Sequence, residues 1–387
     1  MLRRDFCKWP LLAMVAANGV ACRDSQPAGV DVGFRAIFSG CDDAGGTHYI
    51  AHLDRAAQVV SRIAVPQRVH GSVYAPQQRL ALFFARRPGT HLYVLDTTSG
   101  RLIHTVENAA DRHFYGHGVV SADGHWLYTT ENNLTDLSGV IGVYSLQGKP
   151  NKVAEFASGG IGPHQLALMP DGQTLVIANG GMATHPSFER EVLNLESMAP
   201  NLAYLDLASG AVVEYHEPPH HKMSIRHLDV ALDGRVVFGV QYQGELTDAV
   251  PLVGSHRRGE DIQWLELPEP VQLSVKQYTA SVAVDAAGET ALVSCPRGNL
   301  IGCWDLASGK LLQQLQSRDA AGLFRVGNHT QAGNHTPSDN QEQAVKSTWV
   351  SSNGVGEMSL LQSNRASLRS QSLSTGGWRW DNHLTVI

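Results

Sequence analysis

The stretch HQLALMPDGQTLVIANGG, from His164 to Gly181, contains a histidine, an alternating apolar strand, an Asp-Gly turn and a second apolar strand. Its head recurs as HGSVYAP from His70, HGVVSADG from His117 and HLDVALDG from His227, and without the histidine as SVAVDAAG from Ser281. The first three histidines are evenly spaced, since 117 − 70 = 47 and 164 − 117 = 47. A period of this size in an all-strand pattern is typical of a β-propeller, in which each repeat forms one four-stranded blade.

Turn motifs place the strands within each blade. Asp-Gly pairs follow the first strands and are typical of the hairpin turn that leads into the second strand. Asp-x-x-Ser-Gly motifs follow the third strands, where Asp and Ser bond turn amides and Gly takes a positive φ. Because this turn chemistry accounts for the aspartates, we interpret them as structural and not as metal ligands. The motifs are LDTTSGR from Leu95, LDLASGA from Leu205 and WDLASGK from Trp304.

The histidine-headed strands open blades two to five, and blade six begins near Thr279. Blade seven would begin near Ala321, but its sequence departs from the repeat. The polar run from Asn328 reads as a loop, followed by weak strands at STWVSS and EMSLLQ. We therefore expect a degenerate seventh blade.

The two ends of the chain complete the count of blades. Between Phe34 and Pro66 the sequence supplies three strands, and no histidine-headed strand precedes them. The missing innermost strand is HLTVI, from His383 to Ile387. A ring closed by strands from both termini leaves no exposed sheet edge. The sequence thus predicts an all-β, seven-bladed β-propeller that forms a single domain over residues 30–387.

Residues 1–22 have the features of an export signal peptide. An Arg3-Arg4 pair precedes a short apolar region and a small-residue site that ends at Ala21. The pair resembles a twin-arginine signal, although Leu2 stands where Ser or Thr is usual, so ordinary secretion is the alternative. Cys22 follows only a partial lipoprotein box, which leaves a lipid anchor as a second alternative. We expect a periplasmic protein.

Composition and charge argue against nucleic-acid binding, and the sequence predicts no membrane span. The 387 residues are 43% hydrophobic and 17% charged, and the formal net charge is −6 with the charges scattered along the chain. This balance offers no basic surface for nucleic acid. No apolar run reaches the ~18 residues that a membrane-spanning helix needs.

Two insertions interrupt the repeat. Residues 182–200 and 244–261 fall between the second and third strands of blades four and five. Connections of this length are more often functional than simple spacers. In a propeller such connections share a face with the starts of the innermost strands, so both insertions should overhang the face where the histidines lie.

The histidines themselves are the main candidate site. Each lies at the same position of its repeat, the start of the innermost strand, and innermost strands line the central channel. The five histidines are His70, His117, His164, His227 and His383. A single histidine at a strand start is more often a backbone partner than a ligand. Repetition in five blades instead indicates a metal or anion site, because Ser, Thr or Asn would meet a structural need equally well. Neutral imidazole suits copper, iron, zinc or nickel.

Further polar residues at the ends of second strands and near the histidines could form a second shell around a metal or bind an anionic ligand. The alternative is that they are solvent-exposed polar residues at the rim of the channel, with no functional role. These candidates are Arg86, Glu131, Asn179, Arg226, Gln241 and Arg297, and we place Arg257 and Arg258 on the second insertion.

Taken together, eight short motifs resemble a family of exported bacterial propellers catalogued as a domain of unknown function. They are FARRPG from Phe84, TENN from Thr130, GIGPHQ from Gly160, IANGGMATHP from Ile177, SIRHLDV from Ser224, QYQG from Gln241, PLVGSHRRG from Pro251 and WDNHL from Trp380. Members are often encoded beside imelysin-type iron-regulated proteins and di-haem peroxidase-like proteins, so the resemblance implies a role near periplasmic iron handling. The chain departs from the family pattern in blade seven, where Ala320-Ala321-Gly322 replaces the x-Cys-Gly expected after Asp319.

Three functions are consistent with these features. The first is an accessory protein of iron or copper handling that binds a transition metal, iron or copper, at the histidines. The second is an interaction scaffold without a metal. The third is a metal-dependent oxidoreductase, for which the histidine-lined copper propeller of nitrous-oxide reductase offers a fold analogy. We favour a non-enzymatic metal-binding protein that partners periplasmic iron-handling proteins of imelysin or di-haem type.

Overall fold

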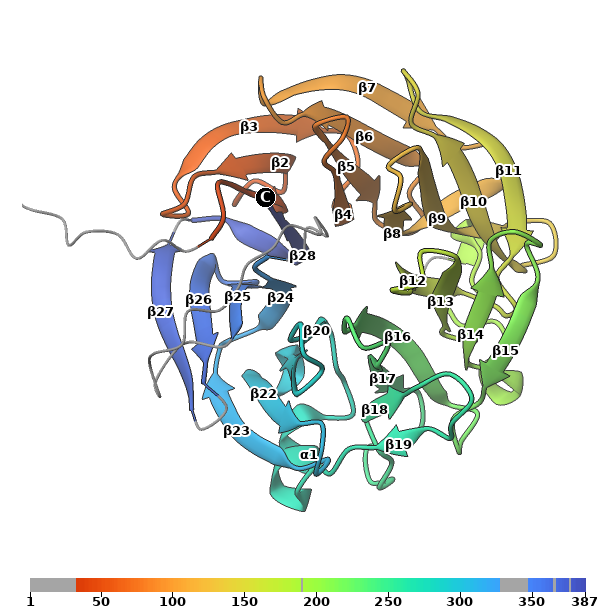
Figure 1. Cartoon of the computed structure of the whole chain (residues 1–387), viewed down its shortest axis with the longest axis vertical. Coiled ribbons are helices and arrows are strands. Elements are labelled where there is room, and N and C mark those ends of the chain that lie inside the picture. The colour runs from red at the N-terminus through yellow and green to blue at the C-terminus, as the bar shows by residue number, and fades with distance from the viewer. Residues whose placement is uncertain (1–32, 189–190, 328–346, 365–366, 376) are drawn as a thin grey trace, which may run out of the picture. The chain divides into compact units, whose positions relative to one another are not determined.

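Seven four-stranded antiparallel sheets are arranged radially around a central axis (Figure 1). The structure is a computed structural model that describes residues 33–188, 191–327, 347–364, 367–375 and 377–387. The predicted signal peptide lies outside these residues. The strands nearest the axis are β28, β4, β8, β12, β16, β20 and β24, so the seven-bladed β-propeller predicted from the sequence is confirmed.

The first four blades follow the predicted strand order from the axis outward. Blade one contains β28 (Arg379–Val386), β1 (Ile37–Asp42), β2 (His48–Leu53) and β3 (Val59–Val65). Blade two contains β4 (Val69–Ala75), β5 (Leu80–Ala85), β6 (His91–Asp96) and β7 (Arg101–Glu107). Blade three contains β8 (Arg112–Val120), β9 (Trp126–Asn133), β10 (Gly139–Ser145) and β11 (Asn151–Ala157). Blade four contains β12 (Pro163–Leu168), β13 (Thr174–Asn179), β14 (Asn201–Asp206) and β15 (Val212–His216).

The remaining three blades have the same order. Blade five contains β16 (Met223–Val230), β17 (Val236–Tyr242), β18 (Val253–His256) and β19 (Gln263–Trp264). Blade six contains β20 (Val282–Val284), β21 (Thr290–Cys295), β22 (Leu300–Asp305) and β23 (Leu311–Gln316). Blade seven contains β24 (Ala320–Arg325), β25 (Ser347–Asn353), β26 (Glu357–Ser363) and β27 (Leu368–Thr375). The described helical segments are η1 (Pro186–Phe188), η2 (Leu195–Ser197), α1 (Glu269–Val275) and η3 (Pro296–Gly298).

Both termini contribute to blade one, as the sequence predicts. β28 pairs antiparallel with β1, and the register places Ile37 opposite Val386 and Ser39 opposite Leu384. Beyond the strand, the amide of Ile387 donates to the carbonyl of Ala36 at 2.9 Å. The last strand of the chain therefore occupies the innermost position of the first blade and closes the ring.

Blade seven is more complete than its sequence indicates. It departs from the repeat as predicted, yet all four of its strands form. Trp349 and Leu361 are buried in its core, and the polar residues Ser351, Ser352 and Asn353 of β25 are buried as well. The polar run that the sequence assigned to a loop lies outside the described residues.

The second insertion differs from its prediction. Residues 244–261 do not form one connection, because β18 (Val253–His256) lies within them. Only residues 243–252 join the second and third strands of blade five, whereas residues 257–262 join the third and fourth strands. Arg257 and Arg258 therefore lie on the face opposite the one predicted, where Arg257 pairs with Asp233 of an Asp-Gly turn.

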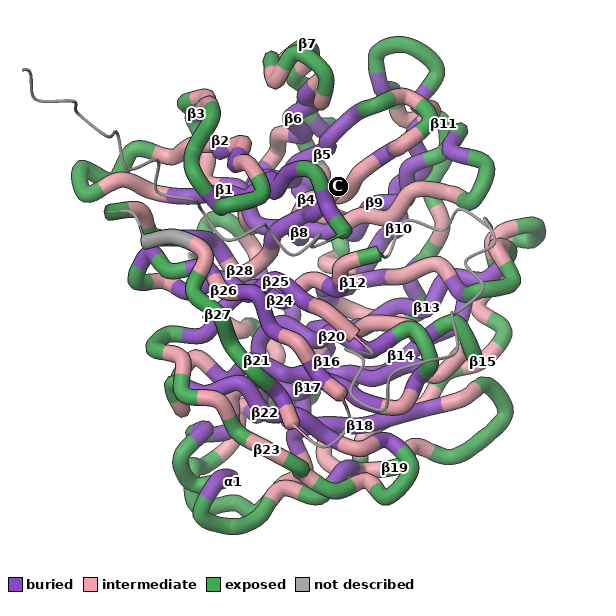
Figure 2. Tube along the Cα trace, turned by 60° about the vertical axis from the view of Figure 1, so that its left-hand side comes forward, coloured by how far each residue is buried: buried purple, intermediate pink, exposed green. Residues whose placement is uncertain are grey.

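The turns and the cores explain why the repeat folds in this way. In the Asp-x-x-Ser-Gly turns the aspartate accepts the serine amide, at 2.8 Å for Asp206 and Ser209. These contacts confirm the structural interpretation of the aspartates. The second and third strands of each blade are largely buried (Figure 2), and apolar clusters fill the space between neighbouring blades. Hydrophobic burial on both faces of each sheet holds the blades together.

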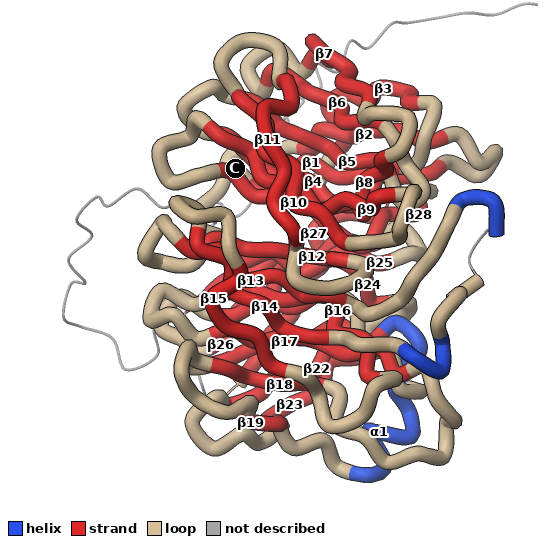
Figure 3. The backbone as a smooth tube through the Cα atoms, turned by 90° about the vertical axis from the view of Figure 1, so that its right-hand side faces the viewer, coloured by secondary structure: helices blue, strands red, loops and turns tan. Residues whose placement is uncertain are grey.

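One face of the ring carries most of the irregular structure. Figure 3 shows the helical segments gathered on a single side of the stacked strands. This is the face of the connection between β13 and β14, which contains η1 and η2 and is called the lid below, residues 182–200 with 189–190 undescribed. Among the described residues, no helix has the length and apolar character to cross a membrane.

Deleting residues 380–387 tests the closure of the ring. Trp380, Leu384 and Val386 are all buried, and burial of such side chains contributes roughly 1.5–3 kcal/mol each. Because whole domains are stable by only about 5–15 kcal/mol, we expect the truncated protein to lose its cooperative thermal transition. Replacement of the exposed Arg379 by Ala is the control. A truncated protein with an unchanged Tm would contradict the shared blade.

Candidate metal centre

Each predicted histidine lies on an innermost strand at a break in regular pairing. His70 is on β4, His117 on β8, His164 on β12, His227 on β16 and His383 on β28. The register between the first and second strands shifts at or beside every one of them. Such irregularities re-aim side chains that a regular strand would place elsewhere. The repeated irregularity turns five imidazoles toward the axis.

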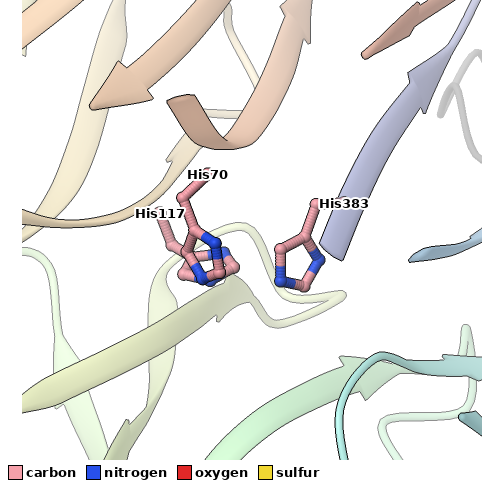
Figure 4. A group of neighbouring side chains, drawn as sticks. All are labelled: His70, His117 and His383. Atoms are coloured by element: carbon pink, nitrogen blue, oxygen red, sulfur yellow. The ribbon is translucent and has the colours of Figure 1, made fainter. Parts of the chain in front are cut away.

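The five imidazoles form one compact cluster. Ring centroids of blade neighbours are 4.9 Å apart for His70 and His117, 5.2 Å for His117 and His164 and 4.6 Å for His164 and His227. His383 closes the set at 4.8 Å from His227 and 4.9 Å from His70. Figure 4 shows how His70, His117 and His383 converge from three strands. We call these five residues the histidine cluster.

A glycine makes the close approach of two of these rings possible. Gly116 has a φ of +108°, which L side chains rarely adopt. A Cβ at this position would lie 2.7 Å from Cδ2 of His70. Any other residue would therefore push the His70 ring away from its neighbour His117.

Hydrogen bonds outside the cluster orient two of the rings. Nδ1 of His70 lies 3.4 Å from Oδ1 of Asp381, and Nδ1 of His227 lies 3.1 Å from Oε1 of Gln165. Because both partners are acceptors, each Nδ1 carries the proton, and each neutral ring presents the lone pair of Nε2. A carboxylate or carbonyl that fixes the tautomer in this way is the usual outer shell of a metal-binding histidine.

The inward-facing nitrogens have few partners of their own. Nε2 of His117 and Nε2 of His383 are buried without a hydrogen bond. Nε2 of His164 lies 3.3 Å from Nε2 of His227, so His164 donates to the lone pair of His227. Two ligands about 2.1 Å from a tetrahedral metal are about 3.4 Å apart. This pair already has the spacing of two metal ligands.

Two groups of three histidines can hold an ion. In the first (His70, His117, His383) and the second (His117, His164, His227), the ligand nitrogens lie within 4.8 Å of one another. His117 belongs to both groups. Since all the donors are neutral nitrogens, the set suits a borderline transition metal and not a hard cation such as Mg²⁺ or Ca²⁺.

Burial keeps the cluster uncharged. Desolvation by burial lowers the pKa of four histidines well below the usual 6.5, and electrostatic repulsion from neighbouring histidines and arginines lowers it further. These four are His117, His164, His227 and His383. Burial also lowers the pKa of His70, although Asp381 opposes the shift. Burial alone would raise the pKa of Asp381, but His70 and Arg68 lower it below its usual range. Neutral imidazole is the form that binds metals.

Two of the predicted outer residues contribute charge near the cluster. The positive charges of Arg86 and Arg226 both act on histidines of the cluster and lower their pKa values. Burial, followed by the charge of Arg87, lowers the pKa of Arg226 itself to about 10. Nε of Arg226 is buried without a hydrogen-bond partner.

The other four predicted outer residues make contacts within or between blades. Lys152 pairs with the buried Glu131 at 2.7 Å in a partly buried ion pair. Asn179 donates to the carbonyl of Ser158, and Gln241 donates to the carbonyl of Thr279, both at 2.9 Å. Arg297 stacks over the ring of Tyr278, 4.3 Å from its centroid. These contacts give each residue a structural role.

Sequence reasoning missed the two residues that orient the rings. Gln165 directly follows His164 but bonds His227 in the next blade. Asp381 precedes His383 by two positions but bonds His70 in blade two. Both lie within conspicuous motifs, GPHQ and WDNHL. Their partners are visible only once the blades are placed side by side.

A second group with metal-ligand chemistry, Glu214, His216 and His256, lies on the outer strands. Both ring nitrogens of His256 are already bonded, to the hydroxyl of Tyr204 at 2.5 Å and the carbonyl of Glu260 at 2.8 Å. Nε2 of His216 bonds Glu214 at 2.8 Å. These contacts account for the group without an ion.

Comparison with known proteins places the chain in a family. Residues 63–387, from β3 to the end, match the family described as "Protein of unknown function (DUF1513)". The chain belongs to this family. A search of curated protein sequences finds no match. Among solved structures, hydrazine synthase of Kuenenia stuttgartiensis is similar, with a TM-score of 0.60 and 14% identity over 91% of this chain and 99% of that chain. At this identity the likeness supports the fold alone.

The lowered histidine pKa values predict a pH dependence of stability for the metal-free protein. Their folded-state pKa values lie below the unfolded value of ~6.5, so below that pH the unfolded chain binds more protons and stability falls. After chelation, Tm should stay level from pH 8 to 7 and fall steadily from pH 6.5 to 5. His117→Gln should reduce this slope. Equal slopes for parent and His117→Gln would contradict the buried neutral cluster.

Proposed function

We propose that this propeller binds one transition metal ion at the histidine cluster and serves iron or copper handling as an accessory protein. The observation that carries the proposal is the convergence of imidazoles from five blades, with the Nε2 atoms of His117 and His383 buried and unpaired. A buried polar atom without a partner costs free energy. Coordination to an ion would satisfy both nitrogens.

The donor set also bears on which metal is bound. Imidazole binds copper, zinc, iron and nickel, and affinity for divalent ions generally rises from iron to copper. An all-nitrogen site therefore favours copper when both metals are present. The resemblance to a family often encoded beside imelysin-type and di-haem proteins supports iron instead. Metal analysis of protein purified from the periplasm decides between them.

Paired substitutions test the metal site. His117→Ala together with His227→Ala removes one ligand from the first histidine group and two from the second, and should reduce bound copper, iron and zinc from about one equivalent per chain to a trace. Each single substitution should weaken binding substantially. His104→Ala, on the outer strand β7, is the control and should change nothing.

Two results would favour a scaffold without a metal. One is undiminished metal in a double variant whose circular dichroism shows a folded propeller. The other is a parent protein with no stoichiometric metal. Turnover by the metal-loaded protein would instead point to a metal-dependent oxidoreductase.

The proposed location is the periplasm, and the proposed partners are iron-handling proteins of imelysin or di-haem type. Support comes from the signal-like residues 1–22 and from the resemblance described above. Fractionation with cross-linking should find the protein in the periplasm, cleaved near Ala21 and joined to a partner of one of these types. Full-length protein in the cytoplasm would refute export, and a periplasmic protein cross-linked to neither type would refute the partners.

A further inference from the structure

Two cavities lie end to end in the channel beyond the histidine cluster. The first, about 130 Å³, is lined by His117 and His383 and by residues one or two positions after the other histidines, such as Ser72 and Asp229. The second, about 440 Å³, is lined by later residues of the same strands and by the turns that follow them. Both cavities share four lining residues: Ser72, Asp229, Phe324 and Arg325. They therefore form one passage from the cluster to the face opposite the lid.

On the other side of the ring, the lid packs against blades two and three. Its first residues, Met182, Ala183 and Thr184, are all buried. The hydroxyl of Thr184 accepts a hydrogen bond from Arg87 at 3.1 Å and lies 3.4 Å from the hydroxyl of Tyr115. These contacts tie the lid to blades two and three. They hold the start of the lid in place on this face.

Positive charge also disfavours the entry of a metal ion from the lid side. Arg86, Arg87 and Arg226 lie on the lid side, where Arg86 and Arg226 are near enough to lower histidine pKa values. Three guanidinium groups repel a metal cation. The passage on the other side contains a carboxylate, Asp229, whose oxygens accept the amides of Val284 at 2.8 Å and Val230 at 2.9 Å.

Arg325 balances that carboxylate without blocking the passage. It donates to the carbonyl of Val284 at 3.0 Å, so its guanidinium is held against blade six. Carboxylate, guanidinium and the Ser72 hydroxyl make the junction of the two cavities polar, and the second cavity opens to solvent through a mostly apolar wall. On this side a hydrated ion meets polar groups at the junction of the cavities, whereas on the lid side it meets packed side chains and three guanidinium groups.

We propose that metal ions reach and leave the histidine cluster through the channel mouth opposite the lid, past Ser72 and Asp229. This inference rests on the proposed metal function and adds the path by which the metal ion reaches the cluster. It predicts that a group attached at the junction of the cavities slows metal loading without changing how much metal is bound at equilibrium.

A reversible block at Ser72 provides the test. Ser72→Cys is a small change, and the chain's own described thiols, Cys41, Cys295 and Cys303, are buried, with pKa values that burial raises to about 12. Benzyl methanethiosulfonate should therefore label the introduced thiol selectively among them. Treated parent protein controls for Cys7 and Cys22, which lie outside the described residues.

Loading of Co²⁺ is followed by its visible absorption after rapid mixing. We expect the labelled Ser72→Cys protein to load at least tenfold more slowly than the unlabelled variant, and to reach the same stoichiometry. Removing the label with a reductant, followed by desalting, should restore the rate. Ser187→Cys, on the exposed part of the lid, is the matched control and should load at the parental rate when labelled.

The outcomes separate the route from the function. Labelled Ser72→Cys that loads at the parental rate overturns the route, and so does labelled Ser187→Cys that is slowed to the same extent. Either result leaves metal binding by the parent intact. A parent that binds no Co²⁺, copper, iron or zinc overturns both proposals.

Discussion

The pairing of β28 with β1 is the constraint on which the fold and the candidate site both depend. It closes the ring, and it also brings Asp381 and His383 beside blade two. Arg68 bonds Asp381 at 2.6 Å, and Ser72 bonds Thr385 at 2.7 Å, so side chains link β28 to β4 as well. Without this strand the cluster loses one imidazole and the carboxylate that orients another. Closure and site assembly are the same event.

Burial gives the cluster its chemical character. Five imidazoles in water would titrate near neutral pH, but here desolvation and their mutual proximity keep them neutral. Asp381 and Gln165 offset part of the free-energy cost of desolvation, because they accept hydrogen bonds from Nδ1 of His70 and Nδ1 of His227. The protein leaves the inward nitrogens of His117 and His383 without partners. Under the proposed metal function, a cation bound to these nitrogens would stabilise this interior.

Local features of the sequence predicted the convergence of the histidines, the positions of the turns and the number of blades. The histidines recur in one phase of a repeat, and each turn contains its own capping residues, as Asp206 and Ser209 illustrate. Contacts between blades were not predictable in this way, since the partner of Gln165 lies 62 residues away along the chain. β18 was missed because it has only four residues, VGSH, with little apolar periodicity. Blade seven forms because its neighbours bury it, which its weak local pattern does not reveal.

The position of His383 also fixes the order in which the cluster can be assembled during synthesis. A ribosome makes His70, His117, His164 and His227 first, and those blades can stack as they emerge. The fifth imidazole, together with the Asp381 carboxylate, follows more than 150 residues after His227. A nascent or prematurely terminated polypeptide therefore cannot present the whole donor set. Under the proposed metal function, a chain that lacks the His383 strand would bind the metal more weakly than a chain that has it.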